Sequence, residues 1–470
     1  MSDFSLPNEW LESKLSDVCE YIRGITYNKS QSDSIEKDGY LPILRANNIQ
    51  NGQIIFDDLV FVDASLIKEN QLLRKSDILI AMSSGSKALV GKSASVKSDL
   101  DFAFGAFCGV LRPFKSVEAR LINYFTQSAY YRNSISKLSA GANINNLKPS
   151  HFDELVLPLP PKAEQEKIAE LLDSHLAQVE TIKTSLNAII PILKKFRQSV
   201  LANAVSGKLT KDWRQNNDVK EWQKVEWFDI TTKEKDAFKR GPFGSSLKKD
   251  MFVESGYKVY EQYCPINDDC SFARYYITPE KFEEMKEFEV KADDFLISCS
   301  GVSLGRITQV PKNYEQGIIN QALLRVRLNN DIYNGKFFKI LFRSPTFQKV
   351  IFDNSTGSAI PNLKASKLLK KISVPLLDIE EQIEIVKRVE ELFAFADTIE
   401  TQINNALDRV SHLTQSILYQ AFTGKLTADW RTENIDLITG DNSAESLLAK
   451  IQAEKDKAKP VKKPRKKKEA

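Results

Sequence analysis

The chain repeats itself at an offset of 217 residues. Residues 158–214 align without a gap to residues 375–431, and the two stretches are identical at 21 of 57 positions. Shorter matches lie upstream: SAGANINNLK (139–148) pairs with STGSAIPNLK (355–364), and DILIAMSSG (77–85) pairs with DFLISCSGV (294–302). A repeat of this size predicts two structurally equivalent halves related by a pseudo-two-fold axis. The less similar segments between the matches are then the loops, where recognition usually resides.

Each copy of the repeat contains a long apolar heptad pattern. Apolar side chains recur at alternating spacings of four and three residues from Ile168 and again from Ile385. This 3.5-residue period is typical of a coiled-coil seam and predicts two helices of about 42 residues, or about 63 Å each. The seam positions are Ile168, Leu172, Val179, Ile182, Leu186, Ile189, Leu193, Phe196 and Val200 in the first helix, and Ile385, Val389, Leu392, Ile399, Ile403, Val410, Leu413 and Ile417 in the second.

Signals for the ends of these helices are also repeated. Pro161 and Glu164 mark the first start, Asp378 and Glu381 mark the second, and Gly207 and Gly424 fit the C-terminal stops. Pro191 lies inside the first helix and should kink it.

The chain length between the helices indicates how they pair. The segment between them, about 160 residues, would form a compact domain about 40 Å across, which can bridge neighbouring helix ends but not span a whole helix. We therefore expect an α+β protein with a pseudo-two-fold internal repeat, in which two homologous globular recognition domains are separated by two long helices that form an antiparallel coiled coil. The predicted order is domain 1 (1–156), spacer helix 1 (157–214), domain 2 (215–373), spacer helix 2 (374–431) and a C-terminal extension with a disordered basic tail (432–470).

Charge is concentrated at the C-terminal end of the chain. Residues 450–470 hold ten Lys or Arg and three acidic residues, a balance of +7; the whole chain carries +4, so residues 1–449 sum to −3. Such a tail can attract phosphates without sequence preference, or it can simply keep the protein soluble. If the remainder binds nucleic acid, it must do so through local patches or share phosphate contacts with basic partner subunits.

Other features bound the location and the redox chemistry. No apolar run reaches the roughly 20 residues needed to cross a bilayer, and the N-terminus lacks a cleavable signal, so we expect a cytoplasmic protein with no membrane contact. The five cysteines form no CxxC pair. This pattern favours buried thiols over a disulfide framework or a zinc site.

The sequence gives little support for catalysis. SSGSKALVGKS (83–93) resembles a phosphate-binding loop, but Gly85 and Gly91 enclose five residues where that loop requires four. Only three histidines are present, and no GxSxG, HExxH or EF-hand pattern occurs. The Asp/Asn-Pro-Pro-aromatic loop with which amino-methyltransferases hold a flipped base is also missing. We therefore expect no catalytic residue, metal site or cofactor in this chain.

Several motifs together resemble one family. RGITY, LPILRANNIQNG, IAMSSGSK, FGAFCGVLRP, LSAGANINNLKP, PLPPKAEQ and GKLT..WR make the chain similar to HsdS, the specificity subunit of type I restriction and modification enzymes, and most similar to the K-type (IA) subfamily. The resemblance covers essentially the whole chain. KRGPFGSSLKKDM and YKVYEQY in the second module resemble a different type of target recognition domain of the same family.

This resemblance implies a function and a set of partners. Family members read a split, asymmetric site in double-stranded DNA, with one half-site per module. The resemblance also implies two methyltransferase subunits (HsdM) and two restriction and translocation subunits (HsdR). S-adenosylmethionine, ATP and Mg would then be bound by those partners.

Candidate base-reading residues follow from side-chain chemistry, because Arg suits guanine and Asn or Gln suits adenine in the major groove. For each of them a surface or fold-stabilising role is the alternative, and Arg23 and Arg240, which occur in both copies, better suit backbone contact. Gly24 and Gly241 are predicted to be turn residues. The candidates are Arg23, Tyr27, Arg45, Asn47, Asn48, Ser84, Lys87, Asn143 and Asn145 in the first module, and Arg240, Phe243, Ser245, Ser246, Gln262, Tyr263, Ser300 and Arg306 in the second.

Two other functions explain less of the sequence. A coiled-coil adaptor that binds proteins at both ends would explain the helices but not the Asn-rich and Ser-rich loops. A self-sufficient DNA methyltransferase is disfavoured by the missing catalytic loop.

Overall fold

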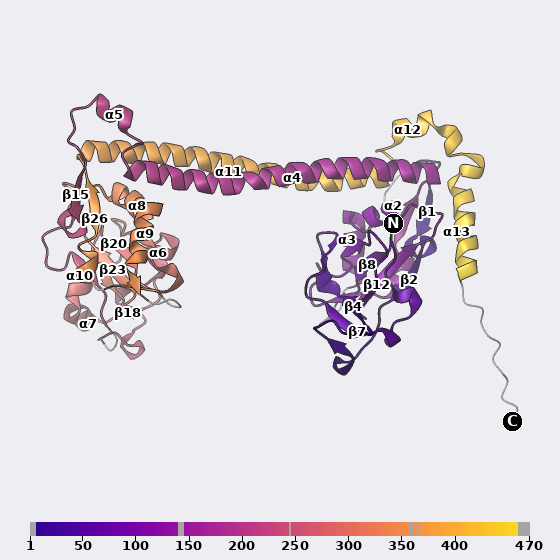
Figure 1. Cartoon of the computed structure of the whole chain (residues 1–470), viewed down its shortest axis with the longest axis horizontal. Coiled ribbons are helices and arrows are strands. Elements are labelled where there is room, and N and C mark those ends of the chain that lie inside the picture. The colour runs from indigo at the N-terminus through magenta and orange to yellow at the C-terminus, as the bar shows by residue number, and fades with distance from the viewer. Residues whose placement is uncertain (1–5, 140–144, 244–245, 357–360, 365, 459–470) are drawn as a thin grey trace. The chain divides into compact units, whose positions relative to one another are not determined.

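The computed structural model describes residues 6–139, 145–243, 246–356, 361–364 and 366–458. The chain divides into two compact units, the first made of residues 1–185 with 406–470 and the second of residues 186–405. Two helices of 44 residues, α4 (Lys162–Val205) and α11 (Ile379–Phe422), contribute one half each to either unit. Figure 1 shows the elements of each unit along the chain.

The first unit contains a globular module built around two sheets, and the sequence predicts that it is a recognition domain. In its described part, one four-stranded antiparallel sheet has the order β10-β8-β12-β2, and a second has the order β11-β4-β7-β3 with β11 parallel to β4. Shorter pairs are β1-β14, β13-β9 and β5-β6. The strands are β1 (Leu11–Lys14), β2 (Cys19–Arg23), β3 (Ser32–Asp33), β4 (Tyr40–Leu44), β5 (Ile49–Gln50), β6 (Gln53–Ile54), β7 (Val60–Asp63), β8 (Ile78–Ala81), β9 (Ser83–Ser84), β10 (Ser93–Ser95), β11 (Ala103–Phe104), β12 (Cys108–Pro113), β13 (Asn145–Asn146) and β14 (Val156–Leu159). Its helices are α1 (Leu15–Val18), α2 (Ala119–Phe125), α3 (Ala129–Leu138), α12 (Ala428–Glu433) and α13 (Ala444–Ala458), besides its halves of α4 and α11.

The second unit has a module of the same plan. Its described strands form an antiparallel sheet of order β16-β23-β20-β21 and a mixed sheet of order β18-β17-β22-β19, with the pairs β15-β26 and β24-β25 beside them. The strands are β15 (Gln223–Glu226), β16 (Phe238–Arg240), β17 (Tyr257–Tyr260), β18 (Tyr276–Ile277), β19 (Glu289–Val290), β20 (Phe295–Ser298), β21 (Ile307–Gln309), β22 (Gly317–Ile319), β23 (Leu323–Val326), β24 (Ser355–Thr356), β25 (Asn362–Leu363) and β26 (Ser373–Leu376). Its helices are α5 (Lys211–Gln215), α6 (Tyr263–Asn267), α7 (Pro279–Glu284), α8 (Gly335–Arg343), α9 (Pro345–Asp353) and α10 (Ser366–Leu369).

The strand orders confirm the internal repeat. β2, β12, β8 and β10 correspond to β16, β23, β20 and β21, and each module has one parallel pair, β4 with β11 or β17 with β22. The two modules are therefore homologous α+β folds, as the sequence predicts.

The long helices begin and end where the sequence signals lie. Both are followed by a glycine in the left-handed region, Gly207 at φ +75° and Gly424 at φ +71°, a conformation that glycine adopts without strain. The first helix continues through Pro191. Most seam side chains are buried or half-buried, but Ile182 and Leu413 are 46 % and 45 % exposed. At these two positions nearly half of the side chain stays exposed, because a pair of helices leaves the edges of its contact strip open to water.

Within the second unit the two helices run antiparallel. Arg197 of α4 forms ion pairs with Asp397 and Glu400 of α11, at 2.6 and 2.8 Å. Further along the chain, Asp212 pairs with Arg388 at 2.8 Å. Residues further toward the C-terminus from α4 thus pair with residues nearer the N-terminus of α11.

A buried carboxylate joins the two copies of the repeat inside each unit. In the second unit Glu381 Oε1 accepts from Thr210 Oγ1 and Arg214 Nη2, both at 2.7 Å, and Oε2 accepts from Trp222 Nε1 at 2.9 Å. In the first unit Glu164 has the same partners. They are Trp10, Thr427 and Arg431, at 2.7, 2.6 and 2.7 Å. The Thr and Arg of the GKLT..WR motif in one copy therefore donate to the glutamate of the other copy, which also accepts from that copy's tryptophan.

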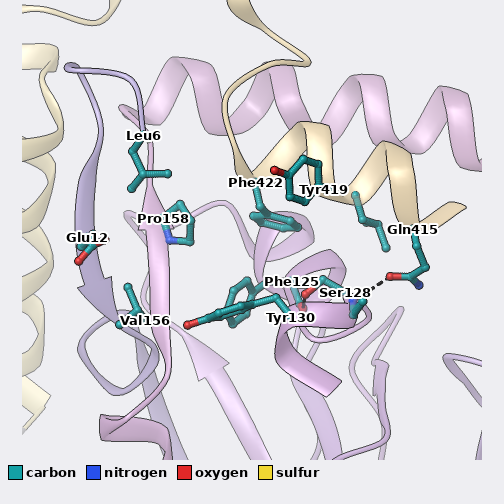
Figure 2. Close-up of a pocket in the computed structure, with 12 residues that line it drawn as sticks. Leu6, Glu12, Phe125, Ser128, Tyr130, Val156, Pro158, Gln415, Tyr419 and Phe422 are labelled. Atoms are coloured by element: carbon teal, nitrogen blue, oxygen red, sulfur yellow. Dashed lines mark hydrogen bonds between the residues drawn. The ribbon is translucent and has the colours of Figure 1, made fainter. Parts of the chain in front are cut away.

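Phe422 at the end of α11 packs against the first module, where it meets Phe125 edge to face. A small apolar cavity of about 60 Å³ lies between Phe422, Phe125 and Tyr130 (Figure 2). Gln415 Oε1 accepts from the Ala129 amide at 2.8 Å beside it. This cavity is too small for a nucleotide, so we assign it to packing between helix and module.

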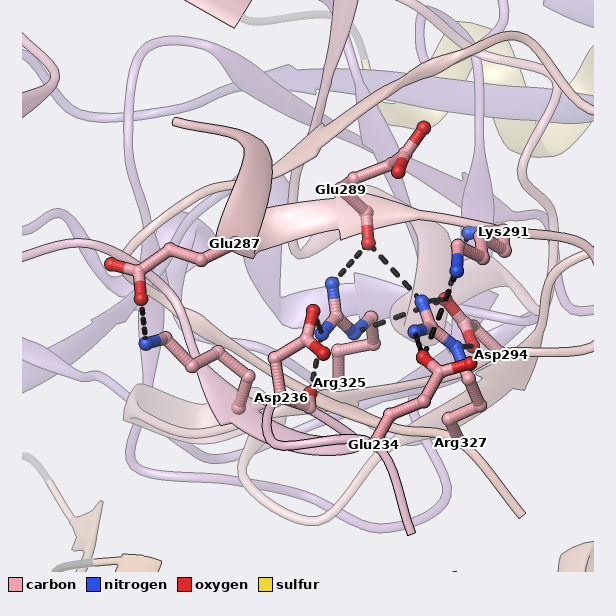
Figure 3. Close-up of polar contacts among 9 residues, drawn as sticks. Glu234, Asp236, Glu287, Glu289, Lys291, Asp294, Arg325 and Arg327 are labelled. Carbon is pink, nitrogen blue, oxygen red and sulfur yellow. Dashed lines mark hydrogen bonds and ion pairs between the residues drawn. The ribbon is translucent and has the colours of Figure 1, made fainter. Parts of the chain in front are cut away.

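Both modules bury an equivalent aspartate and arginine pair. Asp77 precedes β8 and receives a bidentate contact from Arg112 of β12, with both distances 2.7 Å. Asp294 precedes β20 and receives the same contact from Arg327, which follows β23, at 2.8 and 2.9 Å. The second module adds Arg325, which is fully buried and faces Asp236 (Figure 3).

Candidate nucleic-acid interface

An open groove of about 560 Å³ lies on the first module, at the ends of β2 and β4. It is lined by Tyr27, Arg45 and Asn47, three of the predicted base-reading residues, together with Ser83 and Phe107. Cationic, amide, hydroxyl and aromatic groups are the side chains that contact base edges and phosphates. The groove is therefore the best candidate for DNA contact in this module.

One glycine in each module, Gly24 or Gly241, packs closely against a facing backbone. A Cβ at Gly24 would lie 2.1 Å from the Gly105 carbonyl oxygen, and one at Gly241 would lie 1.8 Å from that of Asn320. Neither glycine has φ in the left-handed region. The repeated Arg-Gly is thus explained by backbone packing against the facing strand, and the turn conformation predicted from the sequence is not the reason for glycine here.

Arg45 and Asn47 follow β4 and share one partner. Arg45 Nη2 lies 2.7 Å from Asp58 Oδ2, and Asn47 Nδ2 donates to the same oxygen at 3.1 Å. Asn48 is different, because its side chain is 1 % exposed and donates to the carbonyls of Ile55 and Asp57. Asn48 therefore stabilises the turn, which corrects the prediction that it reads a base.

The serine and glycine loop after β8 is held by contacts within the protein, and its tip is exposed to solvent. Asn145 is buried and pairs with Ser84 in the β9-β13 ladder, while Arg132 donates to the carbonyls of Val90 and Ala88 at 2.9 and 2.6 Å. Lys87 is exposed at the tip of the loop and is free to meet phosphate. Asn145 thus has a supporting role, and Asn143 lies outside the described residues. Arg23 is exposed at the end of β2 and does not line the groove.

In the second module two predicted readers support the corresponding loop instead. Arg240 donates to the Leu363 carbonyl at 3.0 Å and to Asn362 Oδ1. Gln262 Nε2 donates to Ser298 Oγ and to the Ser300 carbonyl, at 2.8 and 2.9 Å. The Gln262 amide is engaged within the protein, which corrects the prediction that Gln262 reads a base. Arg240, for which the sequence favours contact with the DNA backbone, also supports the loop through its side chain.

Other side chains of the second module are open to solvent. Phe243 is 78 % exposed, and Ser246 is also exposed, whereas Ser245 lies outside the described residues. Tyr263 of α6 packs on Phe272 with ring centroids 4.3 Å apart, and both rings remain partly exposed. Exposed aromatic rings of this kind can contact bases.

Arg306 lines a separate groove of about 480 Å³, next to Asp268 and Arg343. Asp268 pairs with Lys339 and Arg343 at 2.7 and 2.9 Å. Burial alone would raise the pKa of Asp268, but these two cations lower it below its ordinary value. Asp268 thus remains ionised and tethers α6 to α8, while Arg306 stays exposed.

Sequence reasoning missed several exposed groups near these sites. Phe107 is 70 % exposed inside the first groove, and Val302 is fully exposed beside Ser300. Asp58, which contacts Arg45 and Asn47, and Glu261 were not among the predicted residues either. Nothing in the local sequence distinguishes a surface-exposed phenylalanine from a core one, whereas Asp58 could have been suspected from the two consecutive acids in an otherwise apolar stretch.

The remaining chemistry is limited. All five cysteines are free and buried, as expected. Among the described residues no group of three or more His, Cys, Asp or Glu side chains could hold a metal ion. No helix in the described ranges is long and apolar enough to span a bilayer.

Curated proteins of known class match almost the whole chain. The chain is 43 % identical over 464 residues to the type I restriction enzyme EcoKI specificity subunit of Escherichia coli K12, covering 97 % of each protein. It is 41 % identical over 462 residues to the StySPI specificity subunit of Salmonella potsdam, again covering 97 % of each.

Solved structures share the fold at low sequence identity. One match is a chain from a study of complex assembly and conformational transition of the type I R-M system. It has a TM-score of 0.65 at 16 % identity, and the match covers 90 % of this chain and all of that one. The HsdS subunit from Thermoanaerobacter tengcongensis matches with a TM-score of 0.55 at 17 % identity, over 90 % and 99 %. The model of the type I restriction modification DNA specificity domain matches residues 7–190 and 220–409. The chain therefore belongs to the family of type I restriction-modification specificity subunits.

Proposed function

We propose that this chain is the non-catalytic subunit that gives a type I restriction-modification complex its DNA sequence specificity. Each module would read one half of a bipartite site, and the divergence of the two modules would make that site asymmetric. The observation that carries this proposal is the first-module groove, which gathers Tyr27, Arg45 and Asn47 on a repeated scaffold. Relatives named as specificity subunits, at 43 % and 41 % identity, support it.

The long helices complete the proposal. We propose that α4 and α11 form one continuous antiparallel coiled coil that separates the two modules and sets the gap between half-sites. Two methyltransferase subunits and two restriction and translocation subunits would dock on the chain. S-adenosylmethionine, ATP and Mg would reside on those partners, in the cytoplasm. The balance of −3 over residues 1–449 supports shared phosphate contacts, since basic partners would then provide much of the charge.

Replacing Arg45 with Ala tests the groove. We expect target binding to weaken by about 1 to 3 kcal/mol and preference to relax at one base pair, because a side chain that reads a base loses only that contact. The measurement is competition gel shift of the chain assembled with methyltransferase subunits, against duplexes altered at each position of the target. Arg74→Ala is the matched control, since Arg74 is exposed and outside the groove. Uniform weakening across all sequences would assign Arg45 to phosphate.

Lengthening both helices tests the spacer. Seven residues inserted between Asn187 and Ala188 in α4, and seven between Asn405 and Ala406 in α11, preserve the heptad seam and add about 10 Å. At about 3.4 Å per base pair, the preferred gap should grow by about three base pairs. Methylation mapping by sequencing reads the gap directly. An unchanged gap with full activity would show that the helices do not set the distance.

A further inference from the structure

Asn48 fixes the backbone around Arg45. The Arg45 amide donates to Asn48 Oδ1 at 2.8 Å, and Asn48 Nδ2 donates to the carbonyls of Ile55 and Asp57 at 2.9 and 2.7 Å. The end of β4 and the segment before Asp58 are thereby tied together across the turn. Because Asn48 is buried, this frame is rigid and independent of solvent.

Asp58 closes that frame on the groove side. Its φ of +52° is a conformation that Asp and Asn tolerate better than other residues with a Cβ. Arg45 Nη2 donates to the Asp58 carbonyl oxygen at 2.6 Å and to Asp58 Oδ2 at 2.7 Å, and Asn47 Nδ2 reaches the same carboxylate oxygen at 3.1 Å. One carboxylate thus holds two of the predicted base-reading side chains.

The contact adds little to folding. The Asp58 side chain is 76 % exposed and that of Arg45 is 35 % exposed, and ion pairs as open as this contribute weakly to stability. It does restrict two long, flexible side chains to one arrangement. In the described part of the chain, Arg45 Nη1 and Asn47 Oδ1 are left as a donor and an acceptor without protein partners. Groups ordered before binding lose less entropy when they meet a base.

The second module shows that the fold itself does not require this pair. The amide of Gly105 donates to the Leu44 carbonyl at 3.0 Å, and that of Asn320 donates to the Tyr260 carbonyl at 3.0 Å, so Glu261 occupies the place of Arg45. Burial raises the pKa of Glu261, and the nearby Arg274 opposes that rise. Charge at this position is reversed between modules, as expected of a position that sets specificity.

We propose that Asp58 is a positioning residue that orders Arg45 and Asn47 for base reading in the first module. This inference rests on the proposed function. Loss of Asp58 should therefore reduce discrimination at the base pair that Arg45 reads and leave the other positions unchanged.

Asp58→Asn and Asp57→Asn form a matched pair for the test. Both remove one exposed negative charge, and Asn keeps the positive φ of position 58. Among the described residues no side chain contacts the Asp57 carboxylate. Each variant is assembled with methyltransferase subunits, and its binding is titrated with the target duplex that methylation mapping identifies and with duplexes altered at single positions. Both should bind unrelated duplex slightly more tightly, because one acid has been removed in each.

We expect Asp58→Asn alone to lose about tenfold of its discrimination at the Arg45 position. Added to Arg45→Ala, Asp58→Asn should cause no further loss, since it acts through that arginine. Equal discrimination in both Asp variants, a loss spread over all positions, or additive losses in the double variant would overturn the proposal. A wild-type complex without sequence preference would instead refute the proposed function, and this inference with it.

Discussion

Asp294→Asn should destabilise the second unit by about 3 to 5 kcal/mol. Asp294 is fully buried, and its two carboxylate oxygens accept from Arg327 at 2.8 and 2.9 Å (Figure 3). Arg325 Nε lies 3.9 Å from Asp294 Oδ2 and has no hydrogen-bond partner. An amide in place of the carboxylate would leave two guanidinium groups with too little negative charge, and its NH₂ would face the Lys291 amide that now donates to Oδ2 at 2.8 Å.

The first unit provides an internal comparison. Asp77 makes the same bidentate contact with Arg112, but Val110 stands where the second module has Arg325. Asp77→Asn leaves only one guanidinium, that of Arg112, without its carboxylate. Because this guanidinium also donates to the Leu72 carbonyl at 3.0 Å, the substitution should cost less stability than Asp294→Asn. Calorimetry of the full chain measures both changes, and the exposed Asp331→Asn serves as a control.

A second substitution tests the mechanism of that loss. Arg325→Met removes one buried charge while keeping most of the side-chain volume, so in the Asp294→Asn background it should restore much of the lost stability. Equal costs for Asp77→Asn and Asp294→Asn, with no restoration by Arg325→Met, would show that the second arginine does not matter.

The elements with a strict period were predictable from the sequence. The 3.5-residue seam, the glycines after both long helices and the duplication itself follow from spacing alone, and they determine α4, α11 and the equivalence of the two modules. The exposure of Ile182 and Leu413 was not predictable, since periodicity gives the direction of a side chain but not how much of it is covered.

The candidate interface was predictable only in part. Residue chemistry singled out Tyr27, Arg45 and Asn47, and the structure brings all three to one groove, with Arg45 and Asn47 two residues apart in the chain. Their role in base reading stays a prediction. It failed for Asn48 and Gln262, whose amides are used inside the protein. An amide suited to reading adenine is equally suited to binding a backbone carbonyl, and only tertiary contacts decide between the two.

Glu381→Gln is expected to cost about 2 to 4 kcal/mol, because it would remove the negative charge that Thr210, Arg214 and Trp222 share and turn an NH₂ group toward one of these donors. Burial alone would raise the pKa of Glu381, but hydrogen bonds from these three residues lower it below the ordinary value. A depressed pKa stabilises the folded state above the unfolded pKa, about 4.3, and this contribution is lost as pH falls through the folded pKa.

The stability difference between wild type and Glu381→Gln should therefore be full at neutral pH and shrink below about pH 4. Denaturant titrations at several pH values measure it, and Glu380→Gln, which alters the neighbouring acid of the same first turn, is the control. Glu164→Gln should also lower the stability of the first unit at neutral pH, because Trp10, Thr427 and Arg431 donate to Glu164 as the equivalent residues donate to Glu381. A difference that does not change with pH would show that the charge of Glu381 is not what holds the two copies of the repeat together. The loss would then come from packing at Trp222, over which Arg214 lies at 5.4 Å.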